Sequence, residues 1–539
     1  MRPLPPFTLV ICLVGAGVAT VCGKDLTLAI DPGAKLPRID GRLVRVWQQS
    51  TRAAALAAAE QEQVPRSGEL VRAIVESSHG LDPAAGVRLG GRVDLERGSL
   101  SRVLVPPESL KALAAVAGVR QVRAPYLADE LVESEGVALT AADVYHADGE
   151  RGKGARVAII DLGFVGLSEA IEAGEVMQPN DRWNYADGPF EGTTVHGTAV
   201  AEIVADMAPE CELTLIKVDD EIGLAKAAER CASQGLQIIS HSVGWYNTNF
   251  YDGTGYVCDV ARRAQDGGVL WVNAAGNSAE RHYQGAFVDQ DGDGLAEFAA
   301  GDEGIDVFVF QGMQLRVALT WDDWQPRETD YDLYLIDASG GIVARADGHQ
   351  GSGEEPSEFL SYTGQASDTY TLAVRLASGP PKRFALHTFN ADLERANRVG
   401  ERSVVSPADA DSVVAVGAVA AFTYATGPAE GFSSQGPTNA MIMKPDVVAP
   451  DMVQSSSYGY FGGTSAAAPH VAGAAALLAA RRPGSTPNDL RTALMQLAMP
   501  MGDVSVYGAG RLSLEDHSGP NPSPLSSRPR RPPSPKVSS

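Results

Sequence analysis

Residues 462–473 read GGTSAAAPHVAG, in which Ser465 follows two glycines and a threonine and leads into an apolar helical pattern. A serine hydroxyl is a poor nucleophile unless a base takes its proton and a buried acid holds that base in one tautomer. A nucleophilic role for Ser465 therefore requires a histidine and an acidic residue elsewhere in the chain.

Two other segments supply these residues. His196 opens the segment HGTAVA at 196–201, which leads a second apolar helical pattern. Asp161 ends the apolar strand pattern VAIID at 157–161, and α/β sheets place their sites at the carboxyl ends of strands. Asp161, His196 and Ser465 are the candidate catalytic residues.

Together the three segments resemble the subtilisin-type serine proteases. The chain order Asp, His, Ser differs from the orders found in chymotrypsin and in the α/β-hydrolases. The resemblance covers residues 131–280 and 400–514. It implies a secreted serine endopeptidase that hydrolyses peptide bonds in proteins through an acyl-enzyme, with no cofactor required for the chemistry. A catalytically lapsed protein of the same fold, kept as a binding or scaffold protein, is the alternative.

The same resemblance assigns roles to residues outside the triad. Asn277 ends the run VNAAGN at 272–277 and would donate its side-chain amide to the developing oxyanion, although a Gly-Asn pair also marks an ordinary turn. Ser242 begins a segment that matches the edge strand on which the family pairs substrate backbone. The expected substrate-binding residues are Ser242, Val243, Gly244, Ala274, Ala275 and Gly276.

Four positions near these motifs leave open questions. Trp245 either shapes a subsite or is a buried core residue. Leu162 stands where the family usually has a small polar residue, Ala199 where a second histidine is common, and Glu202 where a glycine is usual. These departures alter the packing near the triad but remove none of its members, so they bear on substrate range more than on activity.

The order of strand and helix patterns around the motifs predicts an α/β fold. Near-continuous apolar strand patterns alternate with helical ones, which favours a doubly wound parallel sheet covered on both faces. The predicted strands are 156–160, 213–218, 236–239, 269–272 and 412–419. Residues 131–280 and 400–514 are therefore expected to form one subtilisin-like catalytic domain in two parts.

Between the two parts the pattern changes to alternating strands with few helical signals. Residues 281–399 predict an inserted antiparallel β-sandwich, because the parallel-sheet texture resumes after it. Its predicted strands are 305–310, 315–321, 332–336, 369–376 and 384–389. We expect it to be an accessory binding or stabilising domain.

The N-terminal part of the chain reads as a leader followed by a small α+β module. Residues 1–23 carry an apolar run typical of a signal peptide, which predicts a secreted or extracytoplasmic protein with no membrane contact after cleavage. Residues 24–130 show helical patterns at 51–62 and 108–116 and strand-like ones at 86–94 and 119–122. By position this module resembles the propeptide of secreted subtilases, and a permanent N-terminal domain is the alternative. Autocleavage near Ala128 to Glu135 would distinguish them.

Composition restricts the partners. The net charge of -23 repels polyanions, so nucleic acid is not an expected partner. The family resemblance implies protein or peptide substrates. We expect a monomer. The Pro/Ser-rich residues 515–539 are expected to be a disordered tail.

Two smaller patterns leave alternatives open. Cys211 and Cys231 either form a disulfide across one edge of the sheet or are two buried thiols. Asp289, Asp291 and Asp293 alternate before a glycine like the opening of a calcium loop, to which Glu297 could add an oxygen, but an acidic solvated turn has the same pattern.

Overall fold

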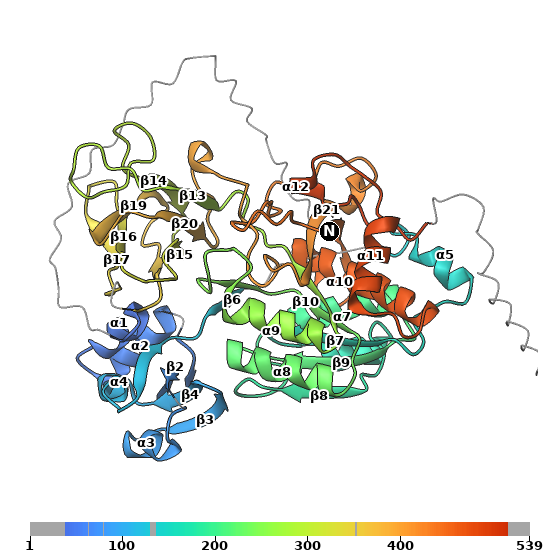
Figure 1. Ribbon diagram of the computed structural model, residues 1–539, viewed down its shortest axis with the longest axis horizontal. Coiled ribbons are helices and arrows are strands. Elements are labelled where there is room, and N and C mark those ends of the chain that lie inside the picture. The colour runs from blue at the N-terminus through green and yellow to red at the C-terminus, as the bar shows by residue number, and fades with distance from the viewer. Residues whose placement is uncertain (1–37, 63, 79, 130–135, 351–352, 516–539) are drawn as a thin grey trace, which may run out of the picture.

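The computed structural model describes residues 38–62, 64–78, 80–129, 136–350 and 353–515. The predicted signal peptide, the residues after 515, and residues 130–135 within the expected cleavage region lie outside them. Figure 1 shows three bodies: an N-terminal module at lower left in blue, a β-rich insert above it, and a larger α/β body to the right. We use "N-terminal module" for residues 38–129 and "insert" for residues 281–399.

A seven-stranded parallel sheet forms the centre of the α/β body, in the order β22-β21-β12-β10-β7-β9-β8. The strands are β7 (Arg156–Asp161), β8 (Asp181–Asn184), β9 (Glu212–Lys217), β10 (Ile238–His241), β12 (Leu270–Ala274), β21 (Val413–Ala420) and β22 (Val447–Asp451). All five strands predicted for this body are present. The α/β fold with a parallel sheet is thereby confirmed.

Helices cover both faces of this sheet. One apolar core joins the sheet to the helices on the first face, and a second core joins it to those on the other. The first face carries α5 (Ala142–Ala147), α6 (Leu167–Ala173), α7 (His196–Met207), α10 (Thr464–Arg481) and α11 (Pro487–Leu497). The second face carries α8 (Glu221–Ser233) and α9 (Gly255–Asp266). The remaining elements are β11 (Gly244–Tyr246), β23 (Val453–Ser455), β24 (Gly459–Phe461), η3 (Ala421–Thr423) and α12 (Val504–Tyr507).

The insert consists of two four-stranded antiparallel sheets, β13-β20-β15-β18 and β14-β19-β16-β17. Apolar side chains from both sheets share one buried core. The strands are β13 (His282–Ala286), β14 (Ile305–Val309), β15 (Gln314–Trp321), β16 (Asp330–Ile336), β17 (Ile342–Ala346), β18 (Ser357–Thr363), β19 (Asp368–Ser378) and β20 (Arg383–Thr388), followed by η2 (Arg395–Asn397).

The N-terminal module packs helices on a five-stranded antiparallel sheet, in which β2 is flanked by β4 and β5. Its helices are α1 (Gly41–Trp47), α2 (Arg52–Gln61), α3 (Pro83–Arg88), η1 (Pro107–Ser109) and α4 (Leu110–Ala114). Its strands are β1 (Arg66–Ser67), β2 (Leu70–Ser77), β3 (Arg92–Arg97), β4 (Leu100–Val105) and β5 (Val119–Arg123). The strand-like pattern at 86–94 is thus wrong in its first half, where α3 ends.

The module leaves toward the α/β body through a short strand, β6 (Leu127–Asp129). β6 pairs antiparallel with β11, with Asp129 opposite Gly244 and Leu127 opposite Tyr246. The N-terminal module is therefore joined by backbone pairing to the strand that follows Ser242 and Val243.

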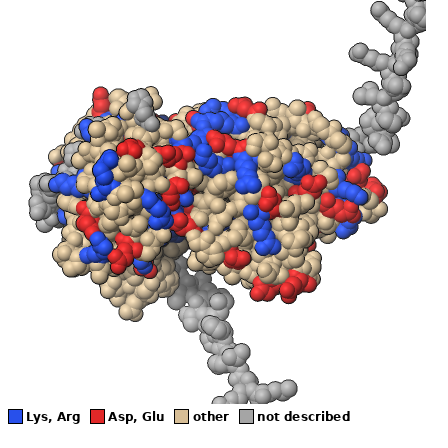
Figure 2. All heavy atoms as spheres, turned by 90° about the horizontal axis from the view of Figure 1, so that it is seen from below, with Lys and Arg blue, Asp and Glu red and all other residues tan. Residues whose placement is uncertain are grey.

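One face of the molecule is of mixed charge. On the face in Figure 2, acidic and basic side chains are interspersed. Among the described residues, no helix combines the length and the apolar character that crossing a bilayer requires.

Candidate active site

Asp161 and His196 meet at the carboxyl end of β7, an interior strand of the parallel sheet. Asp161 is the last residue of β7 and His196 the first residue of α7, and both side chains are fully buried. The Nδ1 atom of His196 lies 2.8 Å from Oδ2 of Asp161 and 2.9 Å from Oδ1. An acid bonded at Nδ1 leaves Nε2 as the basic nitrogen of the imidazole.

Two glycines allow this close approach. A Cβ atom at Gly197 would lie 2.5 Å from the Gly163 carbonyl oxygen and 2.9 Å from Cβ of Asp161. A Cβ atom at Gly163 would lie 2.8 Å from the Glu191 carbonyl oxygen. The glycines that follow Asp161 and His196 in sequence are therefore required by packing.

Ser465 is the second residue of α10 and lies beside the segment that precedes β11. Its Oγ atom donates a 2.7 Å hydrogen bond to the carbonyl oxygen of Ser242, and Oγ of Ser242 donates to the Ser465 carbonyl at 2.8 Å. Gly463, at φ +99°, turns the chain into the helix. The structure thus brings the candidate nucleophile to the beginning of the candidate substrate strand.

Asn277 faces the same helix start. Its Oδ1 atom accepts hydrogen bonds from the backbone N–H of Thr464 at 3.0 Å and from the Thr464 hydroxyl at 2.9 Å. Because both bonds use the carbonyl end of the amide, the NH₂ end is left as the donor. Gly276 contacts the same threonine, since its N–H donates to Thr464 Oγ1 at 3.1 Å.

The remaining expected substrate-binding residues lie at β11 and around the end of β12. Val243, Ala274 and Ala275 are buried. Gly244 approaches another part of the chain closely, since a Cβ there would lie 2.7 Å from Cγ2 of Val405.

Trp245 is a buried core residue rather than a subsite wall. Its side chain is fully buried, and its indole N–H donates to Nε2 of His241 at 3.0 Å. Nδ1 of His241 in turn bonds the Ile160 carbonyl oxygen at 2.8 Å. Burial lowers the pKa of His241 to about 4, which keeps the imidazole neutral and able to accept the indole hydrogen.

A model of the subtilase family matches residues 152–295 and 382–516. The chain belongs to the subtilase family. The predicted recognition is thereby confirmed, and the two matched ranges lie on either side of most of the insert.

Individual subtilases align over shorter stretches. Subtilisin DY of Bacillus licheniformis is 36% identical over 115 residues, covering 21% of this chain and 40% of the relative. Subtilisin BL of Lederbergia lenta is 28% identical over 190 residues, covering 34% of this chain and 66% of the relative. The chain thus covers less than two thirds of either relative. A solved structure of the CspB protease of Clostridium perfringens aligns with a TM-score of 0.47 at 15% identity, over 69% of this chain and 95% of that one.

Glu202, one of the departures in this subtilase, has a defined partner. Its side chain is 3% exposed and accepts a 2.7 Å hydrogen bond from the Ser455 hydroxyl and one of 3.0 Å from the Ser457 N–H. These residues belong to the β23–β24 hairpin, whose Phe461 ring lies edge-on to His196 at 5.5 Å. Glu202 therefore ties α7 to the hairpin that packs against the candidate base.

Three residues of this subtilase site were missed from the sequence. Thr464 bonds the Asn277 side chain, the Phe461 ring packs against His196, and His241 bonds the carbonyl oxygen of Ile160, the residue before Asp161. Thr464 lies beside Ser465 within the quoted run, so its position was a usable signal. His241 and Phe461 carried none, because a single histidine or phenylalanine in an apolar run is most often a core residue.

The acidic loop in the insert brings its three aspartates together. One carboxylate oxygen from each of Asp289, Asp291 and Asp293 lies within 4.8 Å of the others. Each of these carboxylates also accepts a backbone N–H of the loop. Glu297 accepts hydrogen bonds from Gln290 on both carboxylate oxygens and is not part of the three-aspartate cluster.

The cysteines among the described residues are all free. Cys211, Cys231 and Cys258 are buried thiols, so the structure has the second of the two alternatives considered for Cys211 and Cys231. Burial raises the pKa of both of these thiols to about 12, which makes them poor nucleophiles.

Proposed function

We propose that this subtilase is a secreted serine endopeptidase that hydrolyses peptide bonds in proteins, with Asp161, His196 and Ser465 as its catalytic triad. The observation that carries the proposal is the 2.8 Å contact between His196 Nδ1 and the buried Asp161 carboxylate, beside a helix that begins at Thr464 and Ser465. The family membership supports the reaction class.

The proposed reaction begins with the Ser465 hydroxyl turning from the Ser242 carbonyl toward Nε2 of His196. His196 takes the hydroxyl proton while Oγ attacks the substrate carbonyl carbon, and Asp161 stabilises the imidazolium that forms. His196 then gives the proton to the leaving amine, which leaves an acyl-enzyme on Ser465. A water molecule, activated by the same histidine, releases the acid and restores the serine.

Asn277 and the Ser465 backbone N–H are the proposed oxyanion donors. The hydrogen bonds from Thr464 to Oδ1 of Asn277 support this role, because they orient the amide before charge develops. A donor held in advance costs no reorganisation in the transition state.

Substrate is proposed to pair with Ser242, Val243 and Gly244 and to pass Ala274, Ala275 and Gly276. The pairing of β6 with β11 supports this, because it is the antiparallel arrangement that a bound peptide would adopt there. Residues 24–130 are accordingly proposed as a propeptide that makes the chain a zymogen, following a signal peptide at 1–23.

The other proposed boundaries follow the predictions from sequence. Residues 131–280 and 400–514 form the catalytic domain, residues 281–399 an accessory β-sandwich, and the mature protein is a monomer. The loop of Asp289, Asp291 and Asp293 is proposed to bind a structural calcium ion, since Ca²⁺ prefers carboxylate oxygens.

Hydrolysis of an unfolded protein such as casein tests the proposed activity against the alternative of a lapsed scaffold protein. We expect wild-type protein to release peptides, and the Ser465→Ala and His196→Ala variants to release them at least about 10³-fold more slowly. Equal, background-level release by wild type and both variants would favour the scaffold.

A further inference from the structure

The chain that leads into β6 is held by two carboxylates from different bodies of the molecule. Arg123 ends β5, and its side chain is 4% exposed. Its Nη2 atom lies 2.7 Å from Oε1 of Glu221, and its Nε atom lies 3.5 Å from Oε2 of Glu355. Glu221 begins α8 of the α/β body, whereas Glu355 belongs to the insert between β17 and β18.

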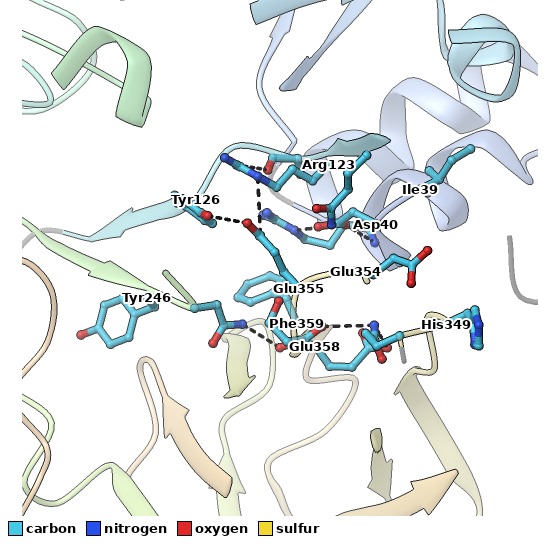
Figure 3. Close-up of a pocket in the computed structure, with 17 residues that line it drawn as sticks. Ile39, Asp40, Arg123, Tyr126, Tyr246, His349, Glu354, Glu355, Glu358 and Phe359 are labelled. Atoms are coloured by element: carbon cyan, nitrogen blue, oxygen red, sulfur yellow. Dashed lines mark hydrogen bonds and ion pairs between the residues drawn. The ribbon is translucent and has the colours of Figure 1, made fainter. Parts of the chain in front are cut away.

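Tyr126 completes the same cluster one residue before β6. Its hydroxyl donates to Oε1 of Glu355 at 2.8 Å, and its backbone N–H donates to Oε2 of Glu221 at 3.4 Å. The Arg123 guanidinium carbon lies 3.9 Å from the centre of the tyrosine ring. Figure 3 shows Arg123 and Tyr126 both directed at Glu355. The two glutamates therefore fix the chain immediately before it pairs with β11.

The cluster lies in the interior, where the three bodies meet. A cavity of about 40 Å³ adjoins it, lined by residues of the N-terminal module, the α/β body and the insert. Burial raises the pKa of the Tyr126 hydroxyl well above its ordinary value, so it remains a neutral donor to Glu355. A buried arginine between two carboxylates is costly to move, because it would lose partners without gaining water.

The pairing of β6 with β11 is too short to define its own register. It spans three residues on each strand, and one of the β11 residues is Gly244, which has no side chain to specify a partner. Short and glycine-containing strands are prone to slip. A slip would present a different peptide bond to Ser465.

We propose that Glu221 and Glu355, by clamping Arg123 and Tyr126, set the register of the N-terminal segment on β11 and so select the bond that is cut in processing. Glu355 is then a positioning residue that the insert contributes to the active site. The inference rests on the proposed peptidase function.

The described pairing ends close to the proposed nucleophile. Ser242, whose carbonyl oxygen lies 2.7 Å from Ser465 Oγ, precedes Gly244 by two positions, and Gly244 lies opposite Asp129. We therefore expect a single cut after Asp129, within the region from Ala128 to Glu135 that the sequence predicts.

Mass spectrometry of the N-termini formed by the full-length chain tests the inference. Wild type should give one new N-terminus, located after Asp129 and within the predicted cleavage region that ends at Glu135. Glu355→Gln and Arg123→Gln should slow processing by about tenfold, because each removes a charged hydrogen-bond partner, and should add N-termini displaced by two residues. Tyr126→Phe, which removes only the hydroxyl, should add the same N-termini with a smaller loss of rate.

Two matched variants distinguish an effect on the register of β6 from an effect on the packing of the N-terminal module against the rest of the molecule. Arg97 of the N-terminal module forms a 2.6 Å ion pair with Glu229 of α8, at a site remote from β6. Arg97→Gln breaks this ion pair. It should slow processing without adding an N-terminus. Glu328→Gln changes an exposed residue of the insert. It should change neither the rate of processing nor the set of N-termini. Thermal unfolding of each variant on a Ser465→Ala background confirms that it folds.

The outcomes distinguish this inference from the proposed function. If Glu355→Gln and Arg123→Gln give the wild-type N-terminus alone at the wild-type rate, the clamp does not set the register. If Ser465 reacts with a fluorophosphonate but the wild-type chain is cut elsewhere or not at all, the inference is again wrong and the peptidase assignment stands. If Ser465 is unreactive and the chain uncut, both fail.

Discussion

The side-chain amide of Asn277 is already oriented in the resting protein, before the proposed oxyanion forms. Its carbonyl end is fixed by two hydrogen bonds from Thr464. The NH₂ end of the amide is then left as the donor. Thr464 is in turn the first residue of α10, next to the proposed nucleophile, so one residue aligns both groups.

Replacing Asn277 by alanine should reduce kcat by about 10²- to 10³-fold with little change in KM, because the lost donor acts on the transition state. Steady-state hydrolysis of a chromogenic peptide measures both constants. Thr464→Val is the matched variant, since it removes the hydroxyl and keeps the backbone N–H, and its loss of kcat should be smaller. A loss of less than tenfold in Asn277→Ala would contradict the assignment.

The residues of the candidate site differ in how clearly the sequence predicts their roles. Asp161, His196, Ser465 and Asn277 lie in motifs and were all predicted. Thr464 was quoted but given no role, because its contact with Asn277 joins positions 187 residues apart. Contacts over such a separation depend on the fold and leave no local pattern.

At the scale of elements, the position of α7 depends on more than its own sequence. Its first residue is His196, and further along the same helix Glu202 bonds the β23–β24 hairpin. The same hairpin sets Phe461 against His196. The helix and hairpin thus hold the proposed base from two sides.

We expect Glu202→Ala to lower the free energy of unfolding by about 1–3 kcal/mol, because it leaves the buried Ser455 hydroxyl and Ser457 N–H without their charged acceptor. Glu202→Gln should lose less, since the amide oxygen remains. Urea unfolding on a Ser465→Ala background measures both. Glu172→Gln on the neighbouring α6, an exposed position, is the control. Equal stability of Glu202→Ala and wild type would show that the hairpin does not depend on this contact.

The strands that the sequence predicted best are those with near-continuous buried apolar residues. The central strands and several strands of the insert are of this kind. β2 was missed because Arg72 interrupts its apolar run, and Arg72 is 1% exposed only because Asp187 and Asp219 of the α/β body neutralise it. β8 was missed because it is a polar edge strand. A charged partner in another body cannot be seen from local pattern.

At the scale of the whole molecule, buried neutral histidines occur in both the α/β body and the insert. Burial lowers the pKa of His241, His470 and His282 to about 4 in each case. The unfolded chain would protonate them near pH 6.5. Between these values the unfolded state binds more protons, so stability is lost as the pH falls from about 6.5 toward 4.

Each such histidine contributes up to about 3 kcal/mol to this acid sensitivity. On a Ser465→Ala background, His241→Asn should be less stable than its parent at pH 8 but should lose less stability between pH 8 and pH 5. Urea unfolding at both pH values measures the difference. His349→Asn, which changes a side chain that is 29% exposed, serves as the control. An unchanged loss in His241→Asn would contradict the role of its burial.

The three bodies were expected from the texture of the sequence, but their junction was not. The backbone pairing of β6 with β11 and the cluster around Glu355 join residues that are distant in the chain. Only the assembled fold shows that the insert reaches the segment that enters the active site.

Labelling by a fluorophosphonate tests the central claim, that Ser465 is a nucleophile activated by His196 and Asp161. We expect the processed wild-type protein to take up one probe, mapped by mass spectrometry to the peptide containing Ser465, and the His196→Ala variant to label at least about 10³-fold more slowly. Ser465→Ala should take up none. Wild-type labelling no faster than that of Ser465→Ala would contradict the account.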